Sequence, residues 1–231
     1  MVWIVSTLLK GVGTVKTDIR KVVEILRKAV GAMRVPIVTE ISQRKKSPFE
    51  VLMATILSLR TKDEVTRAAS KRLFEVASTP MELLALEEGQ IAALIFPVGF
   101  YKTKAKTLRS ICDRLINDYD GKVPDDLDEL LKLKGVGRKT ANLVVTLGFG
   151  KLGVCVDTHV HRISNRLGYV KTRTPEQTEM VLREKLPVDY WIEYNDLLVT
   201  WGQNVCAPIS PFCSRCAIFD YCERVGVKKS R

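Results

Sequence analysis

Apolar residues recur along this chain at the spacing of one helix face, three and four residues apart. Two stripes show the pattern most clearly and consist of Ile19, Val22, Val23, Leu26 and Val30, and of Leu108, Ile111, Cys112, Leu115 and Ile116. This spacing is typical of an amphipathic α-helix. Residues 51–59 are apolar almost all round, which predicts a buried helix. No pair of alternating runs resembles a β-hairpin, so the predicted fold class is all-α.

Four candidate capping boxes mark helix starts, each a Ser or Thr followed three residues later by Glu or Gln. They are Ser47–Glu50, Thr61–Glu64, Thr79–Glu82 and Thr174–Gln177. In such a box the hydroxyl accepts a bond from a free amide of the first turn, and the Glu or Gln bonds back to the cap. Three of the four also place Pro at the first helical position, where its missing N–H costs nothing.

The same periodicity predicts further helices, which brings the total to about ten short ones. The segments are 62–75, 80–96, 125–133, 138–148, 158–167, 175–186 and 190–202. Within 80–96 we expect a break at Glu88-Gly89.

Composition and charge indicate a class of partner. The 231 residues are enough for one or two domains with a sizeable core. Lys and Arg outnumber Asp and Glu by 37 to 26, a net charge of +11. This excess favours an anionic partner, nucleic acid before a membrane surface, although solubility alone is the alternative. No apolar run approaches the roughly 18 residues that cross a bilayer, and no basic stretch precedes the apolar start, so we expect an intracellular, non-secreted protein.

A glycine-rich turn separates the predicted helices 125–133 and 138–148. Its residues and the two that follow are Lys134, Gly135, Val136, Gly137, Arg138 and Lys139. Two helices joined by so short a turn form a helical hairpin. The free amides of the turn and the dipole of the second helix can hold one phosphate oxygen. An isolated Gly-x-Gly would be a plain helix cap, but the flanking cations favour phosphate binding.

Lys139 and Asp157 are the candidate catalytic residues. Lys139 lies in the first turn of a helix, where the dipole and a neighbouring cation favour the neutral amine that a Schiff-base nucleophile needs. A solvated, phosphate-binding lysine is the alternative. Asp157 begins the helix 158–167, so an N-cap is the alternative to a chemical role. His159 and His161 face different sides of that helix and are not predicted to form a metal pair.

Four of the six cysteines fall close together near the end of the chain. They are Cys206, Cys213, Cys216 and Cys222. So dense a set without a secretion signal predicts a metal site rather than disulfides. One Cys-x-x-Cys unit beside longer gaps matches a cubane iron–sulfur cluster better than zinc, which stays a competitor on spacing alone. Cys112 and Cys155 are predicted to be buried free thiols.

Together these features resemble the endonuclease III family of helix-hairpin-helix DNA glycosylases, from about Ile19 to Cys222. The segments that carry the resemblance are Ser47–Ser58, Pro97–Tyr101 with Lys104 and Ala105, Gly135–Asn142, Val156–Arg162 and the four cysteines. The resemblance implies two all-α domains with a DNA cleft between them. A six-helix barrel domain would span 41–151, with the helix-hairpin-helix at about 125–148. An iron–sulfur domain would join 15–40 to 152–222, and 223–231 would be a basic tail.

The resemblance also implies a function in base-excision repair. The protein would be a monomeric, bifunctional DNA N-glycosylase and AP lyase that removes oxidised pyrimidines from double-stranded DNA. Lys139 would form a Schiff base and cleave 3′ to the abasic site by β-elimination, and Asp157 would stabilise the sugar cation and help to deprotonate the amine. The cysteines would bind a 4Fe–4S cluster. The implied DNA contacts are Arg60, Phe100, Lys134, Gly135, Val136, Gly137, Arg138 and His159.

Two positions depart from the family pattern. Arg60 stands where the family commonly has Gln, which fills the hole left by a flipped nucleotide, and Lys134 stands where Pro is frequent. Arginine only donates hydrogen bonds, so the preferred opposite base is expected to differ. Two other functions remain: a mismatch-directed glycosylase without lyase activity, and a non-catalytic DNA-binding module. Lys139 argues against the first, because such relatives typically carry Ser or Tyr there, and its pairing with Asp157 argues against the second.

Overall fold

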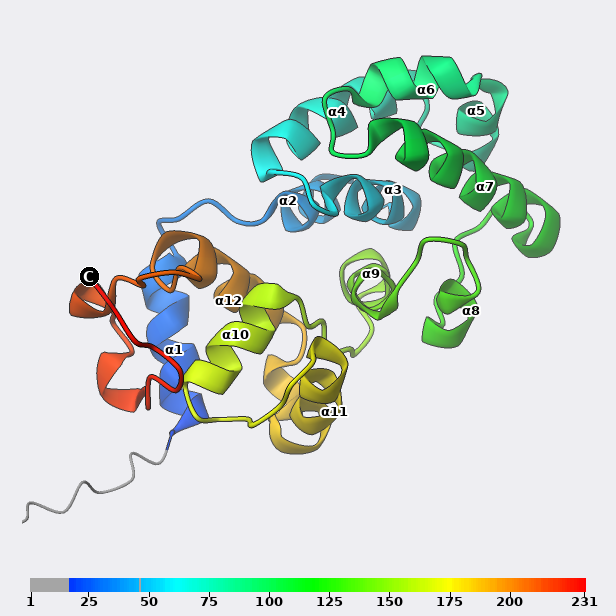
Figure 1. Cartoon of the computed structure of the whole chain (residues 1–231). Coiled ribbons are helices and arrows are strands. Elements are labelled where there is room, and N and C mark those ends of the chain that lie inside the picture. Colours follow the sequence, from blue (N-terminus) through cyan, green and yellow to red (C-terminus); the bar gives the residue numbers. More distant parts are fainter. Residues whose placement is uncertain (1–16, 46) are drawn as a thin grey trace, which may run out of the picture.

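The computed structural model describes residues 17–45 and 47–231, and within these ranges the chain is helical with no strand. Figure 1 shows the helices gathered in two lobes. The described α-helices are α1 (Ile19–Val30), α2 (Ile37–Lys45), α3 (Pro48–Ser58), α4 (Asp63–Val76), α5 (Pro80–Ala85), α6 (Glu88–Ile95), α7 (Tyr101–Tyr119), α8 (Leu127–Leu131), α9 (Arg138–Leu143), α10 (Thr158–Arg166), α11 (Pro175–Lys185) and α12 (Glu193–Asn204). The all-α prediction is confirmed.

Four shorter elements complete the chain. The π-helix η1 (Val144–Gly148) continues α9, and the 3-10 helix η2 (Val188–Tyr190) precedes α12. Two further 3-10 turns, η3 (Cys213–Arg215) and η4 (Phe219–Tyr221), lie in the C-terminal segment that carries the cysteines. Among the described residues, no helix is both long and apolar enough to pass through a bilayer.

The buried apolar side chains form two separate clusters. The first, which we call the barrel lobe, runs from α2 to η1 and centres on α3, where every residue from Phe49 to Leu57 is buried. The second, the terminal lobe, packs α1 and α10 against α12 and continues into the cysteine segment. The barrel lobe begins at Ile37, ahead of the predicted bound at 41, because α2 is one continuous helix whose first residues pack there.

Local helix signals explain three of the four predicted starts. Ser47 and Thr174 each accept a bond from the amide three residues on, and Thr79 forms the full box with Glu82. In each case Pro occupies the first helical turn, as predicted. The box at Thr61 is wrong. The Thr61 hydroxyl instead accepts bonds from the Gly99 amide and the Lys104 ammonium, 3.2 Å from each, so α4 begins without a side-chain cap.

The predicted break within 80–96 is real but lies earlier than expected. The break falls at residues 86 and 87, because Glu87 and Gln90 form a second capping box that starts α6 at Glu88. The segment predicted as one helix over 138–148 is α-helical to Leu143 and then a π-helix. The last turn is therefore wider than an α-helical turn. Within it, the Thr146 hydroxyl donates a hydrogen bond to the Asn142 carbonyl at 2.8 Å.

Candidate active site

A cavity of about 570 Å³ opens between the two lobes. Its walls come from the start of α2 and the loop after α3 on one side, and from the first turns of α10 and α11 and the inner face of α12 on the other. Figure 1 shows α9 between the two lobes, and residues 137–139 at its start line the cavity. Six of the predicted site residues line this one cavity, namely Arg60, Gly137, Arg138, Lys139, Asp157 and His159.

Asp157 is the N-cap of α10, so the capping role predicted as an alternative for this residue is confirmed. Its Oδ1 accepts bonds from the amides of His159 at 2.8 Å and Val160 at 2.9 Å. The side chain is only partly buried, and its Oδ2 has no hydrogen-bond partner among the described residues. The cap therefore fixes the carboxylate at the cavity wall and leaves one oxygen uncommitted.

Lys139 is the second residue of α9 and is partly buried at the same wall. Within the described part of the chain, no hydrogen bond or ion pair holds its amine. Its charge nevertheless acts on neighbouring groups, because it favours the ionised forms of Cys155 and Asp196 against the effect of burial. An amine without a fixed partner, at the wall of a cavity that also holds Asp157 and Asp196, is free to reach a bound molecule.

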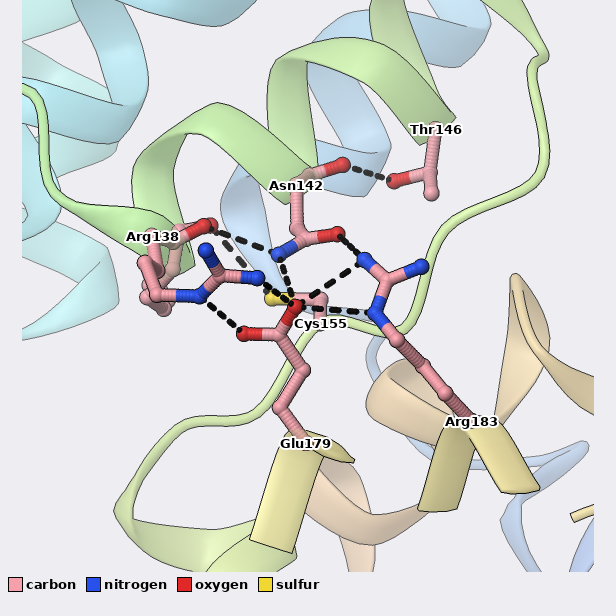
Figure 2. Close-up of polar contacts among 7 residues, drawn as sticks. Arg138, Asn142, Thr146, Cys155, Glu179 and Arg183 are labelled. Atoms are coloured by element: carbon pink, nitrogen blue, oxygen red, sulfur yellow. Dashed lines mark hydrogen bonds and ion pairs between the residues drawn. The ribbon is translucent and has the colours of Figure 1, made fainter. Parts of the chain in front are cut away.

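A buried carboxylate ties the start of α9 to the terminal lobe. Glu179 of α11 receives two bonds from Arg138, at 2.9 and 2.6 Å, and further bonds from Arg183 and Asn142 (Figure 2). Burial acts to raise the pKa of Glu179, but the hydrogen bonds from Arg138, Arg183 and Asn142 hold it below the usual range. These ion pairs and hydrogen bonds compensate the desolvation cost of the buried, charged carboxylate. The network holds α9, and with it Lys139, against α11.

The helical hairpin has the predicted glycine turn, but the residues of the turn have different structural roles. Gly135 has a φ of +88°, and a Cβ there would lie 2.7 Å from Thr107 Cγ2, so only glycine fits. Gly137 faces open space. Val136 does not suit the predicted DNA contact, because its side chain is buried in the barrel lobe and its amide bonds the Leu133 carbonyl. Lys134 is exposed beside the turn.

Arg60 and Phe100 come from two adjacent loops of the barrel lobe. Both have positive φ, 53° and 58°, and the Arg60 guanidinium lies 5.8 Å from the centre of the exposed Phe100 ring. This spacing allows a cation–π contact. The loops touch at the backbone, since a Cβ on Gly99 would lie 2.8 Å from the Arg60 carbonyl. Arg60 lines the cavity, and Phe100 stands beside it rather than in its wall.

Sequence reasoning gave Lys104 no role, yet this buried lysine holds the Arg60 loop in place. Its ammonium donates to the carbonyls of Leu57 at 2.8 Å and Leu59 at 2.6 Å, which closes the end of α3. Burial lowers the pKa of Lys104 to about 8. The sequence does contain a signal for this role, because Lys104 is a lone cation on the apolar face of its helix.

His159 joins the active cavity to the cysteine segment. Its Nδ1 lies 3.0 Å from Arg162 Nη2, and the same guanidinium donates to the Cys206 carbonyl at 2.8 Å. Burial lowers the pKa of His159 and so favours the neutral imidazole, although Asp157 opposes the shift. Gly202 allows this arrangement, because a Cβ there would meet the imidazole at 2.2 Å. His161 instead contacts the Thr178 hydroxyl, on the other side of α10.

The four clustered cysteines line a second, smaller cavity in the terminal lobe. Its donors suit anionic sulfur: Arg166 Nη1 lies 3.2 Å from Cys206 Sγ, and the buried Trp201 indole N–H, in the same lining, acts on the Cys216 thiol and opposes the rise of its pKa on burial. Burial raises the pKa of the Cys222 thiol to about 11, so thiolates there need a cationic group. In the described ranges, no three His, Cys, Asp or Glu side chains converge closely enough for one metal ion. The thiols enclose a space instead of meeting at a point.

Comparison with known proteins decides the family. Residues 53–188 match the model of the HhH-GPD superfamily of base excision DNA repair proteins. Endonuclease III of Thermotoga maritima is 50% identical over 182 residues, covering 79% of this chain and 85% of the relative. The chain belongs to the endonuclease III family. Membership makes it a DNA glycosylase and AP lyase of base-excision repair.

Two further comparisons agree with this assignment. Endonuclease III homolog 2, chloroplastic, of Arabidopsis thaliana is 39% identical, but the chain spans only 59% of its length. The solved structure titled as a trapped endonuclease III–DNA covalent intermediate has a TM-score of 0.80 and 34% identity, and the match covers 89% of this chain and 94% of that one. The helix-hairpin-helix glycosylase fold is therefore confirmed.

The family assignment leaves the roles of individual residues as predictions. The structure brings Lys139 and Asp157 to one cavity, whereas Lys134 and Gly135 lie outside its lining. Cys112 and Cys155 are buried free thiols, as predicted. Sequence reasoning missed four carboxylates in the cavity wall, because acidic residues on amphipathic helices look like an ordinary solvated face. They are Asp63, Glu176, Glu179 and Asp196.

Proposed function

We propose that the chain is a bifunctional glycosylase for oxidised pyrimidines in which Lys139 is the nucleophile and Asp157 its electrostatic partner. One observation carries this proposal: both residues line the same inter-lobe cavity, and each has an uncommitted functional atom, the Lys139 amine and Asp157 Oδ2. The cavity volume of about 570 Å³ falls in the usual range for small-molecule sites and suits a single nucleoside.

In the proposed reaction, the target nucleotide leaves the base stack, because C1′ is inaccessible inside a duplex. The neutral Lys139 amine attacks C1′, and the damaged base departs with the bonding electrons. The C1′–O4′ bond then breaks, O4′ takes up a proton as the sugar ring opens, and a protonated Schiff base remains. The iminium acidifies the C2′ proton, and loss of that proton breaks the strand 3′ to the lesion. Asp157 Oδ2 stabilises the cationic sugar during base loss.

Double-stranded DNA is the proposed partner of the monomeric chain. Lys134, Gly135 and Gly137 are exposed at the hairpin and would hold the phosphate backbone without reading sequence. Phe100 would wedge into the duplex beside the emptied position, with Arg60 facing the orphan base. Arg138 already pairs with Glu179, so its main proposed task is to place Lys139.

The cysteine cavity is the proposed site of a 4Fe–4S cluster held by Cys206, Cys213, Cys216 and Cys222. Thiols that surround a space, with Arg166 and Trp201 as donors toward sulfur, suit a multi-atom cluster better than one tetrahedral zinc. The cluster would organise the C-terminal segment, whose Cys206 carbonyl holds Arg162 beside His159 of the active cavity. Its proposed contribution is structural and DNA-orienting.

Borohydride reduction with duplex DNA tests the catalytic proposal. With an abasic site or thymine glycol, wild type is expected to form a covalent protein–DNA adduct, because borohydride reduces the Schiff base. Lys139→Ala should abolish the adduct, whereas Lys134→Ala, a matched loss of a nearby lysine, should weaken DNA binding and still trap. Base release without trapping would favour the mismatch-directed alternative. Absence of both events would favour a non-catalytic module.

A further inference from the structure

A second carboxylate faces the active cavity from the terminal lobe. Asp196 of α12 lines the same space as Lys139 and Asp157. Its Oδ1 accepts a 2.8 Å bond from the Thr39 hydroxyl of α2, a residue of the barrel lobe that is only 5% exposed. No other hydrogen bond and no ion pair reaches Asp196 from the described residues. Its Oδ2 is therefore uncommitted.

This carboxylate differs from Glu179 in the same wall. Glu179 is neutralised by two guanidiniums, as a structural buried acid should be. Burial raises the pKa of Asp196 to about 6, and the Thr39 hydroxyl and the Lys139 charge only partly oppose that shift. A desolvated acid that forms no ion pair among the described residues, in a cleft that also holds a lysine amine, is typical of a functional site.

The Lys139 ammonium must lose a proton before it attacks, and few groups in the cavity can accept one. Asp157 accepts two backbone amides as the cap of α10, whereas Asp196 accepts a single hydroxyl. Glu179 is paired, and His159 shares Nδ1 with a guanidinium. The charged and titratable groups that face Asp196 across the cavity are Arg60, Asp63, Arg138, Lys139, Asp157, His159, Glu176 and Glu179. Asp63 and Glu176 lie in the first turns of α4 and α11, and hydrogen bonds from its own backbone amide and from Thr174 lower the pKa of Glu176.

We propose that Asp196 takes the proton from the Lys139 ammonium, directly or through one water, and that Thr39 orients the carboxylate for this transfer. The inference rests on the proposed function and deepens it, since it separates two tasks: Asp196 prepares the amine, and Asp157 stabilises the sugar. With an abasic aldehyde, the neutral amine adds to C1′ and the carbonyl oxygen gains the amine's proton. Protonated Asp196 then returns its proton to the departing hydroxyl, which leaves as water as the iminium forms.

Single-turnover trapping on abasic-site DNA, followed over an acid-to-neutral pH series, tests the assignment. The wild-type rate is expected to fall as the pH drops through about 6, because the acceptor becomes protonated. Asp196→Asn should lower the neutral-pH rate on the order of a hundredfold and remove this acid limb. Thr39→Val should move the limb to higher pH, since the lost hydrogen bond was lowering the carboxyl pKa.

Asp189→Asn, an exposed carboxyl just before α12, is the matched control and should retain the wild-type profile. An Asp196→Asn enzyme with an unchanged acid limb, or a Thr39→Val enzyme whose limb stays in place while rates fall, would overturn the inference. The Thr39→Val profile decides the matter even where Asp196→Asn folds poorly. A wild type that never traps would defeat the proposed function itself, a separate outcome from a trapping wild type with unaltered variants.

Discussion

At the scale of single residues, the active cavity contains two acids that are held in opposite ways. Glu179 has two arginine partners and one amide, so its charge contributes to holding the lobes together. Asp196 has one neutral donor, Thr39, and its charge is therefore costly. A buried carboxylate without an ion-pair partner lowers the stability of the fold, and enzymes commonly tolerate such a loss of stability at active sites.

Asp196→Asn should therefore stabilise the protein at neutral pH. The folded-state pKa of about 6 lies above the ordinary 3.8, so ionisation of this carboxyl opposes folding once the pH exceeds its unfolded value. The variant should gain about 2–3 kcal/mol in the free energy of unfolding at pH 7, an upper estimate from the size of the shift. The gain should shrink as the pH falls through 6 and disappear near 3.8.

Urea unfolding of both proteins at a series of pH values measures this difference. Asparagine keeps an oxygen for the Thr39 hydroxyl, so the comparison isolates the charge. A variant that is less stable than wild type at neutral pH would mean that the Asp196 charge supports the fold, and would contradict the assignment of a costly buried acid.

At the scale of elements, the hairpin distinguishes two glycines that look alike in sequence. Gly135→Ala should destabilise the protein by about 1–3 kcal/mol, because the backbone is left-handed and the new methyl meets Thr107. Gly137→Ala should cost less than about 1 kcal/mol, since φ is −96° and nothing lies nearby. Its methyl would instead stand where a phosphate approaches, so DNA affinity should fall.

Thermal unfolding and DNA titration of the two variants separate these effects. Thr107→Ala added to Gly135→Ala should restore part of the lost stability by removing the Cγ2 contact. Equal stability losses at both glycines would show that the turn itself, and not the contact with α7, requires glycine at position 135. An unaltered DNA affinity in Gly137→Ala would remove the hairpin from the proposed interface.

Elements were predictable where their signals are local and failed where a distant group intervenes. Pro48, Pro80 and Pro175 mark true helix starts, because a cap needs only the next turn of the chain. Thr61 has the same local pattern, but its hydroxyl serves Lys104, 43 residues away. The candidate site divides in the same way. The Lys139 and Asp157 motifs could be read directly, whereas the bond between Thr39 and Asp196 spans 157 residues and has no local signature.

At the scale of the whole molecule, polar links between the lobes define the cavity more than the cores do. Each core is apolar and closed on its own, so the lobes could be placed in many relative orientations. Arg138 and Asn142 of the barrel lobe reach Glu179 of α11, and Thr39 reaches Asp196 of α12. The same side chains that shape the site therefore also set the distance between the lobes.

Hydrogen bonds also connect the cysteine cavity to the active cavity. Loss of one proposed ligand in Cys216→Ser should remove iron, sulfide and the visible absorption of the cluster. It should also lower the stability of the terminal lobe, since Ile218 and Trp201 pack in that core beside the cavity. The Cys206 carbonyl anchors Arg162, which contacts His159, so DNA binding should weaken as well.

Cys112→Ser is the matched control, because this thiol is also buried but lies in the barrel lobe, away from the cavity. It should keep full iron content even though it loses some stability from its core. Metal analysis, visible absorption and thermal unfolding of the two variants distinguish the cases. A colourless wild type with stoichiometric zinc, or a Cys216→Ser protein that retains its iron, would contradict the cluster assignment. The barrel lobe would keep its own core in either case, because none of the four clustered cysteines packs in it.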